Sequence, residues 1–425
     1  MLIDLLNARL RRPKILAALL AFMAVLLGPT SAAAQDGNWV GTWMASPQPI
    51  WGADFAFPTK IPQAVRNTTF RQVVRISLGG SRLRLVFSNA YGDVPLRIGA
   101  ASVALPGNGG AASASAIQTL AFGGERGIVI SPGGQAVSDP LDRAVADGAQ
   151  LLVSAWLPDT TPLNTFHWDG RATAWFADGD RTGAASFPTS GSTDARILLS
   201  EILVDTPNAG AVVAVGDSIT DGNGATIDAD ARWPDFLGRR LASHHVAMLN
   251  AGISGARLLR DKMGANLLAR LDRDVLAQPG VKAVVLMIGI NDIAWPGTAF
   301  ARDQAPPTAA AMIAGYRQVI ALAHARNIRV IGATLTPFAG ALSGTPLGDY
   351  YSLDKDVLRQ EVNRWIRGSG AFDGIVDFDR LLRDPEHPAQ FAPAFDSGDH
   401  LHPGDGGNKA MADAVDLAAL VGRWP

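Results

Sequence analysis

A serine that could act as a nucleophile lies at position 218, in the segment AVGDSIT at 214–220. It follows a run of small and β-branched apolar residues from Ala211 to Val215. A short valine-rich run that ends in a turn sequence is typical of a buried parallel strand, and open α/β sheets place their chemistry at the carboxyl ends of such strands. A Gly-Asp-Ser turn can also follow a strand without any catalytic role. Ser218 is therefore a candidate nucleophile that needs partners from elsewhere in the chain.

A base for this serine is available near the C-terminus, in the segment SGDHLHPGD at 397–405. Asp399 precedes His402 by three residues, so its carboxylate can approach one imidazole nitrogen and hold the other toward Ser218. His400 is adjacent to Asp399 and is expected to point elsewhere. Two alternatives are a solvated loop ion pair and a metal site formed with His400. The metal site is disfavoured because no fourth ligand lies nearby in sequence.

Two further segments could supply donors for the oxyanion that forms when an ester carbonyl is attacked. LNAGISG at 249–255 ends in Gly255, and glycine allows a backbone N–H to approach a substrate closely. VVLMIGINDI at 284–293 carries Asn291 just after a buried strand, where a side-chain amide would be a fixed donor. Each has a simpler explanation, namely a glycine required by a turn and an asparagine that caps one.

Four short blocks follow one another at predicted strand ends: GDSIT at 216–220, NAGISG at 250–255, GIND at 289–292 and DHLHP at 399–403. In this order they resemble the SGNH hydrolases, also called GDSL esterases and lipases. The likeness covers about 210–425. Longer phrases such as RWPDFLGRRL and RDVLAQPG are similar to those of two-domain bacterial members with a β-rich N-terminal region. The first block has Ile219 where the motif that names the family has leucine, which is a conservative change.

The resemblance implies a role for each block. The implied roles are Ser218 as nucleophile, Gly255 and Asn291 as oxyanion donors together with the Ser218 backbone N–H, His402 as base and Asp399 as the group that orients it. It also implies a three-layer αβα, flavodoxin-like parallel sheet for the catalytic half, and no metal or cofactor.

The elements that must position these residues fall into two halves with different patterns. From about 36 to 205 the hydrophobic pattern has the short period of strands, as in VVRISLGGSRLRLVFSNAYG, where alternation on both sides of Gly79 and Gly80 predicts a hairpin. Further strand-like runs separated by Gly, Ser and Pro clusters predict a β-sandwich-like domain. The segment DTPNAG at 205–210 is predicted to be a linker between the two halves.

The second half, 210–425, alternates strands and helices. Apolar strands are predicted at 211–216, 246–250, 281–288, 328–334 and 374–378. Between them lie helical segments such as TAAAMIAGYRQVIALAHARN, where Met312, Tyr316, Val319 and Ala323 recur at helical spacing. This alternation predicts a parallel sheet that is covered by helices on both faces.

The N-terminal segment has the order of a secretory signal. A basic stretch ends at Lys14, an apolar run extends from Ile15 to Leu27, and small residues then lead to a cleavage site near Ala34. The alternative, a membrane anchor, is disfavoured because thirteen apolar residues are short for a span. We expect residues 1–34 to be removed, which leaves a secreted or periplasmic protein without a stable membrane anchor.

Composition excludes several classes of function. The formal net charge of −2 gives no reason to expect a nucleic-acid partner. The chain has no cysteine, so disulfides, thiolate-bound zinc and a cysteine nucleophile are excluded. The sequence does not specify an oligomeric state.

These observations predict an exported serine esterase that cleaves small-molecule or polysaccharide esters, with acetyl groups on carbohydrate as the first expectation. Trp156, Trp168 and Trp175 could stack on sugar faces, although core packing is the more common role of tryptophan in a β-rich domain. The alternatives are a lipase, lysophospholipase or arylesterase of the same fold. From another class of protein, the alternative is a catalytically silent glycan-binding protein.

Overall fold

The computed structural model describes residues 37–53, 55–109 and 112–422. The predicted signal segment at 1–34 lies outside these residues. Among the helices of the described ranges, none has both the length and the apolar character that crossing a membrane requires.

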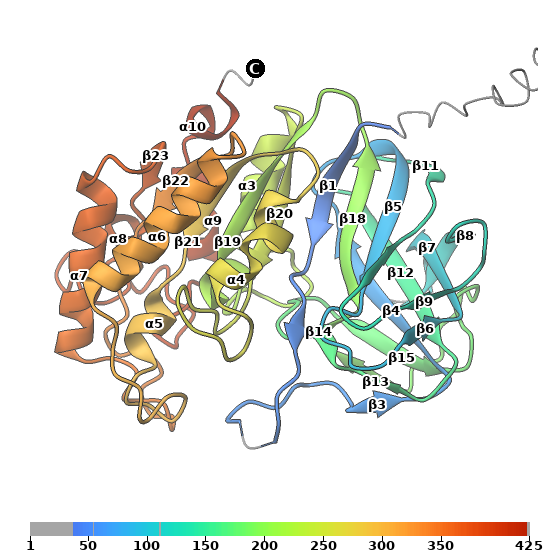
Figure 1. Cartoon of the computed structure of the whole chain (residues 1–425), viewed down its shortest axis with the longest axis horizontal. Coiled ribbons are helices and arrows are strands. Elements are labelled where there is room, and N and C mark those ends of the chain that lie inside the picture. Colours follow the sequence, from blue (N-terminus) through green and yellow to red (C-terminus); the bar gives the residue numbers. More distant parts are fainter. Residues whose placement is uncertain (1–36, 54, 110–111, 423–425) are drawn as a thin grey trace, which may run out of the picture. The chain divides into compact units, whose positions relative to one another are not determined.

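The C-terminal half contains a five-stranded parallel sheet with the order β20-β19-β21-β22-β23 (Figure 1). The strands are β19 (Gly210–Gly216), β20 (Val246–Gly252), β21 (Val281–Met287), β22 (Arg329–Ala333) and β23 (Gly374–Val376). The order reverses direction at β19, the strand that leads to Ser218. In doubly wound sheets ligands bind at the carboxyl ends of strands beside such a reversal. The predicted flavodoxin-like sheet is therefore confirmed.

Helices cover both faces of this sheet. The helices are α2 (Ser218–Asp221), α3 (Trp233–Ala242), α4 (Leu267–Leu271), the π-helix η1 (Asp272–Leu276), α5 (Ile290–Ala294), α6 (Ala309–His324), α7 (Leu353–Gly368), α8 (Phe378–Leu382), α9 (Asp405–Ala414) and α10 (Leu417–Val421). Alternate residues of β19 show the three layers. Val212 packs in a buried cluster with Trp233 of α3, whereas Val213 packs in another with Met312 of α6. Each face of the strand is apolar because each meets a helix layer.

The N-terminal half consists of antiparallel strands. One sheet contains β1 (Trp39–Met44), β18 (Leu199–Asp205), β5 (Gly80–Ser88), β10 (Gln135–Val137) and β11 (Leu141–Val145). A six-stranded sheet contains β16 (Gly191–Thr193), β15 (Ala174–Asp178), β4 (Thr68–Arg75), β12 (Gln150–Leu157), β7 (Ala100–Pro106) and β8 (Ala114–Thr119). Smaller sheets pair β13 (Thr161–Pro162) with β3 (Ala64–Val65), β6 (Leu96–Ile98) with β9 (Ile128–Ile130), and β14 (Thr165–His167) with β17 (Arg196–Ile197) and β2 (Gln48–Pro49). The half is thus β-rich as predicted, but the smaller sheets depart from a simple two-sheet sandwich.

The hairpin predicted around Gly79 and Gly80 is wrong. β4 pairs with β12 and β15, whereas β5 pairs with β18, β10 and β11, so the turn carries the chain from one sheet to the other. Side chains of both strands, including Val74 and Leu85, meet in one buried cluster. Alternation shows that one face of a strand is buried, but it does not show which strand is its hydrogen-bonding neighbour.

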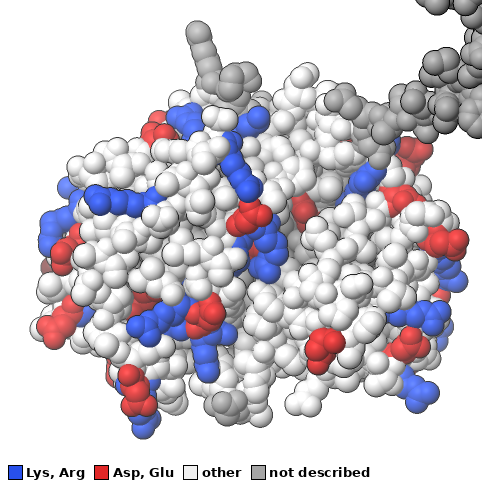
Figure 2. Space-filling model, in the orientation of Figure 1, with Lys and Arg blue, Asp and Glu red and all other residues white. Residues whose placement is uncertain are grey.

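The two halves are in direct contact along β1 and β20. Val40 and Met44 of β1 share a buried cluster with Leu249 of β20. The hydroxyl of Ser77 accepts a hydrogen bond of 2.9 Å from the backbone N–H of Met248. On the face drawn in Figure 2, positive and negative side chains are interspersed over both halves. The β-rich half therefore packs on the edge strand nearest to β19.

Candidate active site

Ser218 is the first residue of α2, immediately after β19. The carboxylate of Asp217 caps this helix by accepting a hydrogen bond of 3.1 Å from the N–H of Ile219. Burial raises the pKa of Asp217 to about 7. The helix has only four residues, so its dipole stabilises a negative charge near Ser218 only weakly. The backbone N–H groups are the stronger donors for such a charge. The turn thus presents the hydroxyl of Ser218 at the carboxyl end of the central strand.

The structure brings Ser218 together with His402 and Asp399. Nε2 of His402 lies 2.8 Å from Oγ of Ser218, and its Nδ1 lies 2.6 Å from Oδ2 of Asp399. The backbone N–H of His402 also donates to Asp399 Oδ1, at 2.8 Å. This geometry allows the imidazole to remove the serine proton while the carboxylate fixes its tautomer.

The carboxylate of Asp399 is stabilised in its ionised form. Burial by itself would raise the pKa of Asp399, but the hydrogen bonds and charge of His402 and the N–H of Leu401 outweigh it and hold the pKa well below its usual range. The hydroxyl of Ser397 lies 3.2 Å from the same carboxylate. An ionised carboxylate at this position favours the imidazolium that forms when His402 takes a proton.

His400 faces a different partner. Its Nδ1 lies 2.5 Å from Oδ2 of Asp396, and its backbone N–H donates to the same side chain. The imidazole is about half exposed and is not among the side chains that line the cavity of Ser218, in keeping with the expectation that His400 points elsewhere. Among the described residues no group of three or more His, Asp or Glu side chains is arranged to hold a metal ion.

Gly255 and Asn291 line the same cavity as Ser218 and His402, and this cavity has a volume of about 220 Å³. Gly255 has a φ of 77°, and a Cβ at this position would overlap the sulfur of Met263, so only glycine fits here. Within the described ranges the N–H groups of Ser218 and Gly255 have no acceptor in the protein. Both donors are therefore available to a ligand.

The side-chain amide of Asn291 is held in one orientation. Its Nδ2 donates to the carbonyl of Ala256 at 3.0 Å, and its Oδ1 accepts a hydrogen bond of 2.5 Å from the hydroxyl of Tyr350. One amide hydrogen is left for a ligand, because the nitrogen carries two. Tyr350 is a site residue that the sequence analysis missed. No motif or spacing could have revealed it, since it lies 59 residues after Asn291.

Asp292 faces away from the cavity. Its carboxylate accepts hydrogen bonds from the backbone N–H groups of Leu258 and Leu259, at 2.7 and 3.0 Å. Burial raises the pKa of Asp292 to about 6. The GIND block thus supplies Asn291 to the cavity and Asp292 to the loop that follows Gly255.

Apolar and aromatic side chains form most of the cavity wall, and they come from both halves of the chain. They are Phe57 and Trp168 from the β-rich half, and Met263, Trp295, Phe300, Leu342, Tyr350 and Leu401 from the C-terminal half. The side chain of Trp168 is mostly buried, donates to the carbonyl of Pro58 at 2.9 Å and has the amine of Lys60 4.0 Å from its ring centre. Of the three tryptophans considered above, Trp168 is the one at this cavity, while Trp156 and Trp175 lie elsewhere, on β12 and β15.

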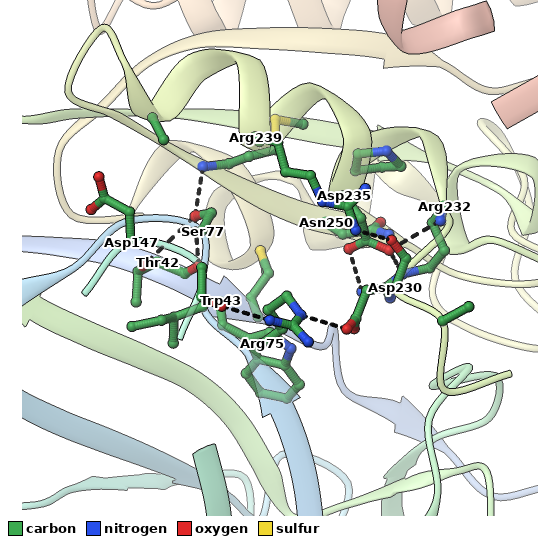
Figure 3. Close-up of a pocket in the computed structure, with 18 residues that line it drawn as sticks. Thr42, Trp43, Arg75, Ser77, Asp147, Asp230, Arg232, Asp235, Arg239 and Asn250 are labelled. Atoms are coloured by element: carbon green, nitrogen blue, oxygen red, sulfur yellow. Dashed lines mark hydrogen bonds and ion pairs between the residues drawn. The ribbon is translucent and has the colours of Figure 1, made fainter. Parts of the chain in front are cut away.

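A larger cavity of about 480 Å³ lies between the β-rich half and α3 (Figure 3). Its charged side chains are paired with one another or with the backbone. Arg75 contacts Asp230 at 2.5 Å, Arg232 contacts Asp235 at 2.8 Å, and Asp147 accepts from the backbone N–H of Gly79. Among the described residues that line it, none is a candidate nucleophile with a base in hydrogen-bond contact, so Ser218 remains the candidate nucleophile.

Comparison with known proteins identifies a family for the C-terminal half. Residues 214–410 match the model of the GDSL-like lipase/acylhydrolase family, a range that includes all four sequence blocks. No curated protein matches the chain.

Solved structures resemble the chain over about half of its length. A GDSL-like lipase from Bacteroides thetaiotaomicron is 19% identical, with 49% of this chain and 87% of that chain covered and a TM-score of 0.36. A carbohydrate acetylesterase family member from Sinorhizobium meliloti is 16% identical, with 50% and 100% covered and a TM-score of 0.39. An acetyl xylan esterase from Geobacillus stearothermophilus is 21% identical, with 50% and 96% covered and a TM-score of 0.35.

Proposed function

We propose, from the premise that residues 214–410 form a domain of the GDSL-like lipase/acylhydrolase family, that this ester hydrolase works through Ser218, His402 and Asp399. The observation that carries the proposal is the contact of 2.8 Å between Ser218 Oγ and His402 Nε2. A hydroxyl and an imidazole at this distance, with a carboxylate on the other ring nitrogen, are arranged for nucleophilic catalysis.

The reaction begins when His402 Nε2 takes the proton of Ser218 and the serine oxygen attacks the ester carbonyl carbon. The carbonyl oxygen becomes an oxyanion that accepts hydrogen bonds from the N–H groups of Ser218 and Gly255 and from Nδ2 of Asn291. His402 then protonates the leaving alcohol, which leaves an acyl group on Ser218. Water, activated by the same imidazole, hydrolyses this acyl-enzyme and regenerates the serine.

The substrate that fits best is an ester with a short acyl group, with acetyl groups on carbohydrate as the first choice. A cavity of about 220 Å³ leaves little room for a long chain beside the catalytic groups. Aromatic rings such as Trp168 offer apolar faces against which a sugar ring can pack. The β-rich half, proposed to be a domain over 36–205, would then shape the cleft through Phe57 and Trp168.

A second candidate is an arylesterase or lipase, and a specific observation favours it. Most of the wall is apolar or aromatic, with Met263, Trp295 and Phe300 among its members. An apolar alcohol or acyl group would bury its surface against such a wall. Activity on acetylated oligosaccharides and on nitrophenyl esters of rising acyl length separates the candidates. Fastest turnover of acetylated sugars supports the first, and fastest turnover of aryl or long-chain esters supports the second.

The deciding variant is Ser218→Ala. We expect it to fold normally and to lose ester hydrolysis by many orders of magnitude, on the order of 10⁶ in kcat if it resembles other serine triads. Turnover of nitrophenyl acetate by the purified variant is the measurement, with circular dichroism as the test of folding. Wild-type turnover in the variant would remove Ser218 from the mechanism. A wild-type protein that hydrolyses no ester but binds glycan would support the silent binding protein instead.

The place of action proposed is outside the cytoplasm, either in the periplasm or secreted. The support is the order of basic, apolar and small residues in 1–34. N-terminal sequencing of the protein from its natural host should find a mature chain that begins near Gln35.

A further inference from the structure

A buried histidine from the β-rich half contacts the segment that carries the nucleophile. His167, at the end of β14, has Nε2 at 2.8 Å from Oδ1 of Asp221, the last residue of α2. Its Nδ1 lies 3.0 Å from the backbone carbonyl of Ser46. His167 and Asp221 are 4% and 1% exposed, so neither group can exchange this partner for water.

The two partners of His167 fix its protonation. The carbonyl of Ser46 can only accept a hydrogen bond, so Nδ1 carries a hydrogen. The other oxygen of Asp221 accepts two hydrogen bonds, from the backbone N–H of Ser254 at 2.7 Å and from its hydroxyl at 2.8 Å. Nε2 of His167 faces the carboxylate of Asp221, and a carboxylate only accepts hydrogen bonds, so the second proton lies on Nε2. His167 is therefore an imidazolium paired with a carboxylate.

Asp221 connects this histidine to the oxyanion site. The carboxylate belongs to the same short helix as Ser218, and through Ser254 it holds the residue immediately before Gly255. The next carboxylate of the β-rich half, Asp169, contacts the same helix end by accepting a hydrogen bond of 3.0 Å from Asn223. His167 and Asp169 of the β-rich half thus contact the segment that begins at Ser218, and Asp221 of that segment holds the loop before Gly255.

We propose that His167 is a positioning residue, whose imidazolium fixes Asp221 and through it sets the Gly255 N–H at the oxyanion position. The inference rests on the proposed function, since it assigns Gly255 to the oxyanion site. A backbone donor that is displaced by a fraction of an ångström stabilises the transition state less while substrate binding changes little. The β-rich half is in this respect part of the catalytic centre.

The charges around His167 set the direction of its pH dependence. Burial lowers the pKa of His167, but Asp221, the carbonyl of Ser46 and Asp169 outweigh it, and the net pKa is raised. Arg232 faces Asp221 as well, and Lys60 and Arg171 face Asp169. Because the folded pKa lies above the unfolded value, the pair contributes fully below about pH 6.5 and is lost as the pH rises through the folded pKa.

The test compares three variants of the full chain. His167→Ala removes both N–H donors of the imidazole, whereas His167→Gln keeps one N–H for Asp221. Ser77→Ala is the control: it also removes a hydrogen bond between the two halves, but the partner of Ser77 is the backbone of Met248. We expect kcat for nitrophenyl acetate to fall about 10²-fold in His167→Ala with KM within about threefold, and His167→Gln to recover part of the loss. Ser77→Ala should keep kcat within about twofold of the wild type.

Amide hydrogen exchange at Ser254 supplies a measurement that does not depend on activity. The exchange should be about tenfold faster or more in His167→Ala and near the wild-type rate in Ser77→Ala. Nitrogen NMR of the wild-type imidazole should show both ring nitrogens protonated at pH 7. If His167→Ala does not fold, His167→Gln decides by the same measurements.

Wild-type kcat and exchange in the His167 variants, equal losses in Ser77→Ala, or a neutral imidazole at pH 7 would each overturn the inference. A wild-type protein that hydrolyses no ester would instead defeat the proposed function. The exchange and NMR measurements would still decide whether His167 holds Ser254.

Discussion

At the scale of single residues, His402 and His400 show how two histidines of one short segment take different partners. Both belong to the segment DHLHP, and both have a carboxylate partner, Asp399 for His402 and Asp396 for His400. Only His402 also reaches Ser218. The two imidazoles differ in their surroundings: the ring of His402 is buried with Nε2 on Ser218, whereas the ring of His400 is about half exposed.

We therefore expect His402→Ala to lose nearly all ester hydrolysis, because no other base contacts Ser218 in the part of the chain that the structure describes. His400→Ala should keep most of it, since the imidazole of His400 contacts Asp396 and not Ser218. Steady-state kinetics on nitrophenyl acetate checks both. If His400→Ala is inactive and His402→Ala is active, His400 and not His402 is the base.

Asn291 and Tyr350 allow a graded test of the oxyanion site. Removing the donor in Asn291→Ala should lower kcat by roughly 10² to 10³, with a much smaller change in KM. Tyr350→Phe keeps the Nδ2 donor of Asn291 but removes the hydrogen bond to its Oδ1. The amide is then held less firmly, so we expect kcat to fall about tenfold. Tyr351→Phe removes a neighbouring hydroxyl and is the matched control. Unchanged kcat in Asn291→Ala would show that the GIND block is only a turn.

At the scale of elements, the turns that follow the strands place the candidate site residues in the cavity. Gly255 follows β20 with a φ of 77° and lies against Met263. The turn can bring its N–H into the cavity because no side chain stands between the backbone and Met263.

Gly255→Ala should therefore lower kcat by about 10-fold or more, since the added methyl must displace Met263 or the turn. Gly370→Ala is the control, because Gly370 has a φ of 66° and open space around its Cβ position. The strained φ should cost each variant about 1 kcal/mol of stability. The overlap with Met263 should cost Gly255→Ala more, and only Gly255→Ala should lose kcat. Equal kcat in the two variants would contradict a role for the Gly255 turn.

At the scale of the whole molecule, the candidate active site is built from both halves of the chain. Phe57 and Trp168 of the β-rich half complete the cavity, and His167 of the same half contacts the nucleophile helix. The contact between the halves continues along β1 and β20, and β18 is the neighbour of β1 within the β-rich half. Changes in this packing affect the stability of the whole protein.

Glu201 of β18 provides a test of this packing. Its Oε1 is buried without a partner, and burial raises the pKa of Glu201 to about 8. The folded protein therefore retains a proton that the unfolded chain releases, so stability falls as the pH rises from about 4.5 to about 8. Glu201→Gln keeps the shape without the charge and should be more stable than the wild type at pH 8 by roughly 2–4 kcal/mol.

Denaturant unfolding of both proteins from pH 5 to pH 9 measures this difference. Glu125→Gln changes an exposed carboxylate and should unfold like the wild type at every pH. Parallel curves for the wild type and Glu201→Gln would contradict the burial of a neutral Glu201.

The sequence by itself determined the features that depend on local pattern. Apolar runs predicted the five parallel strands, because strands buried on both faces are recognisable without knowledge of their neighbours. The blocks after β19, β20 and β21 predicted that Ser218, Gly255 and Asn291 meet, since the carboxyl ends of parallel strands share one edge of the sheet. The fourth block was placed at a strand end as well, but DHLHP lies in the loop before α9, and the resemblance to the family is what predicted His402 as the partner of Ser218. Ser218, Gly255, Asn291 and His402 therefore line one cavity.

Only the tertiary structure decided which segments distant in the chain lie side by side. Three kinds of contact leave no pattern in the local sequence. They are the pairing of β4 and β5 with other strands, the hydrogen bond from Tyr350 to Asn291, and the contact of His167 with Asp221. Each contact joins residues far apart in sequence, and its formation depends on how two packed surfaces fit together. Hydrophobic pattern specifies that a face is buried, whereas the identity of its partner is a property of the folded chain.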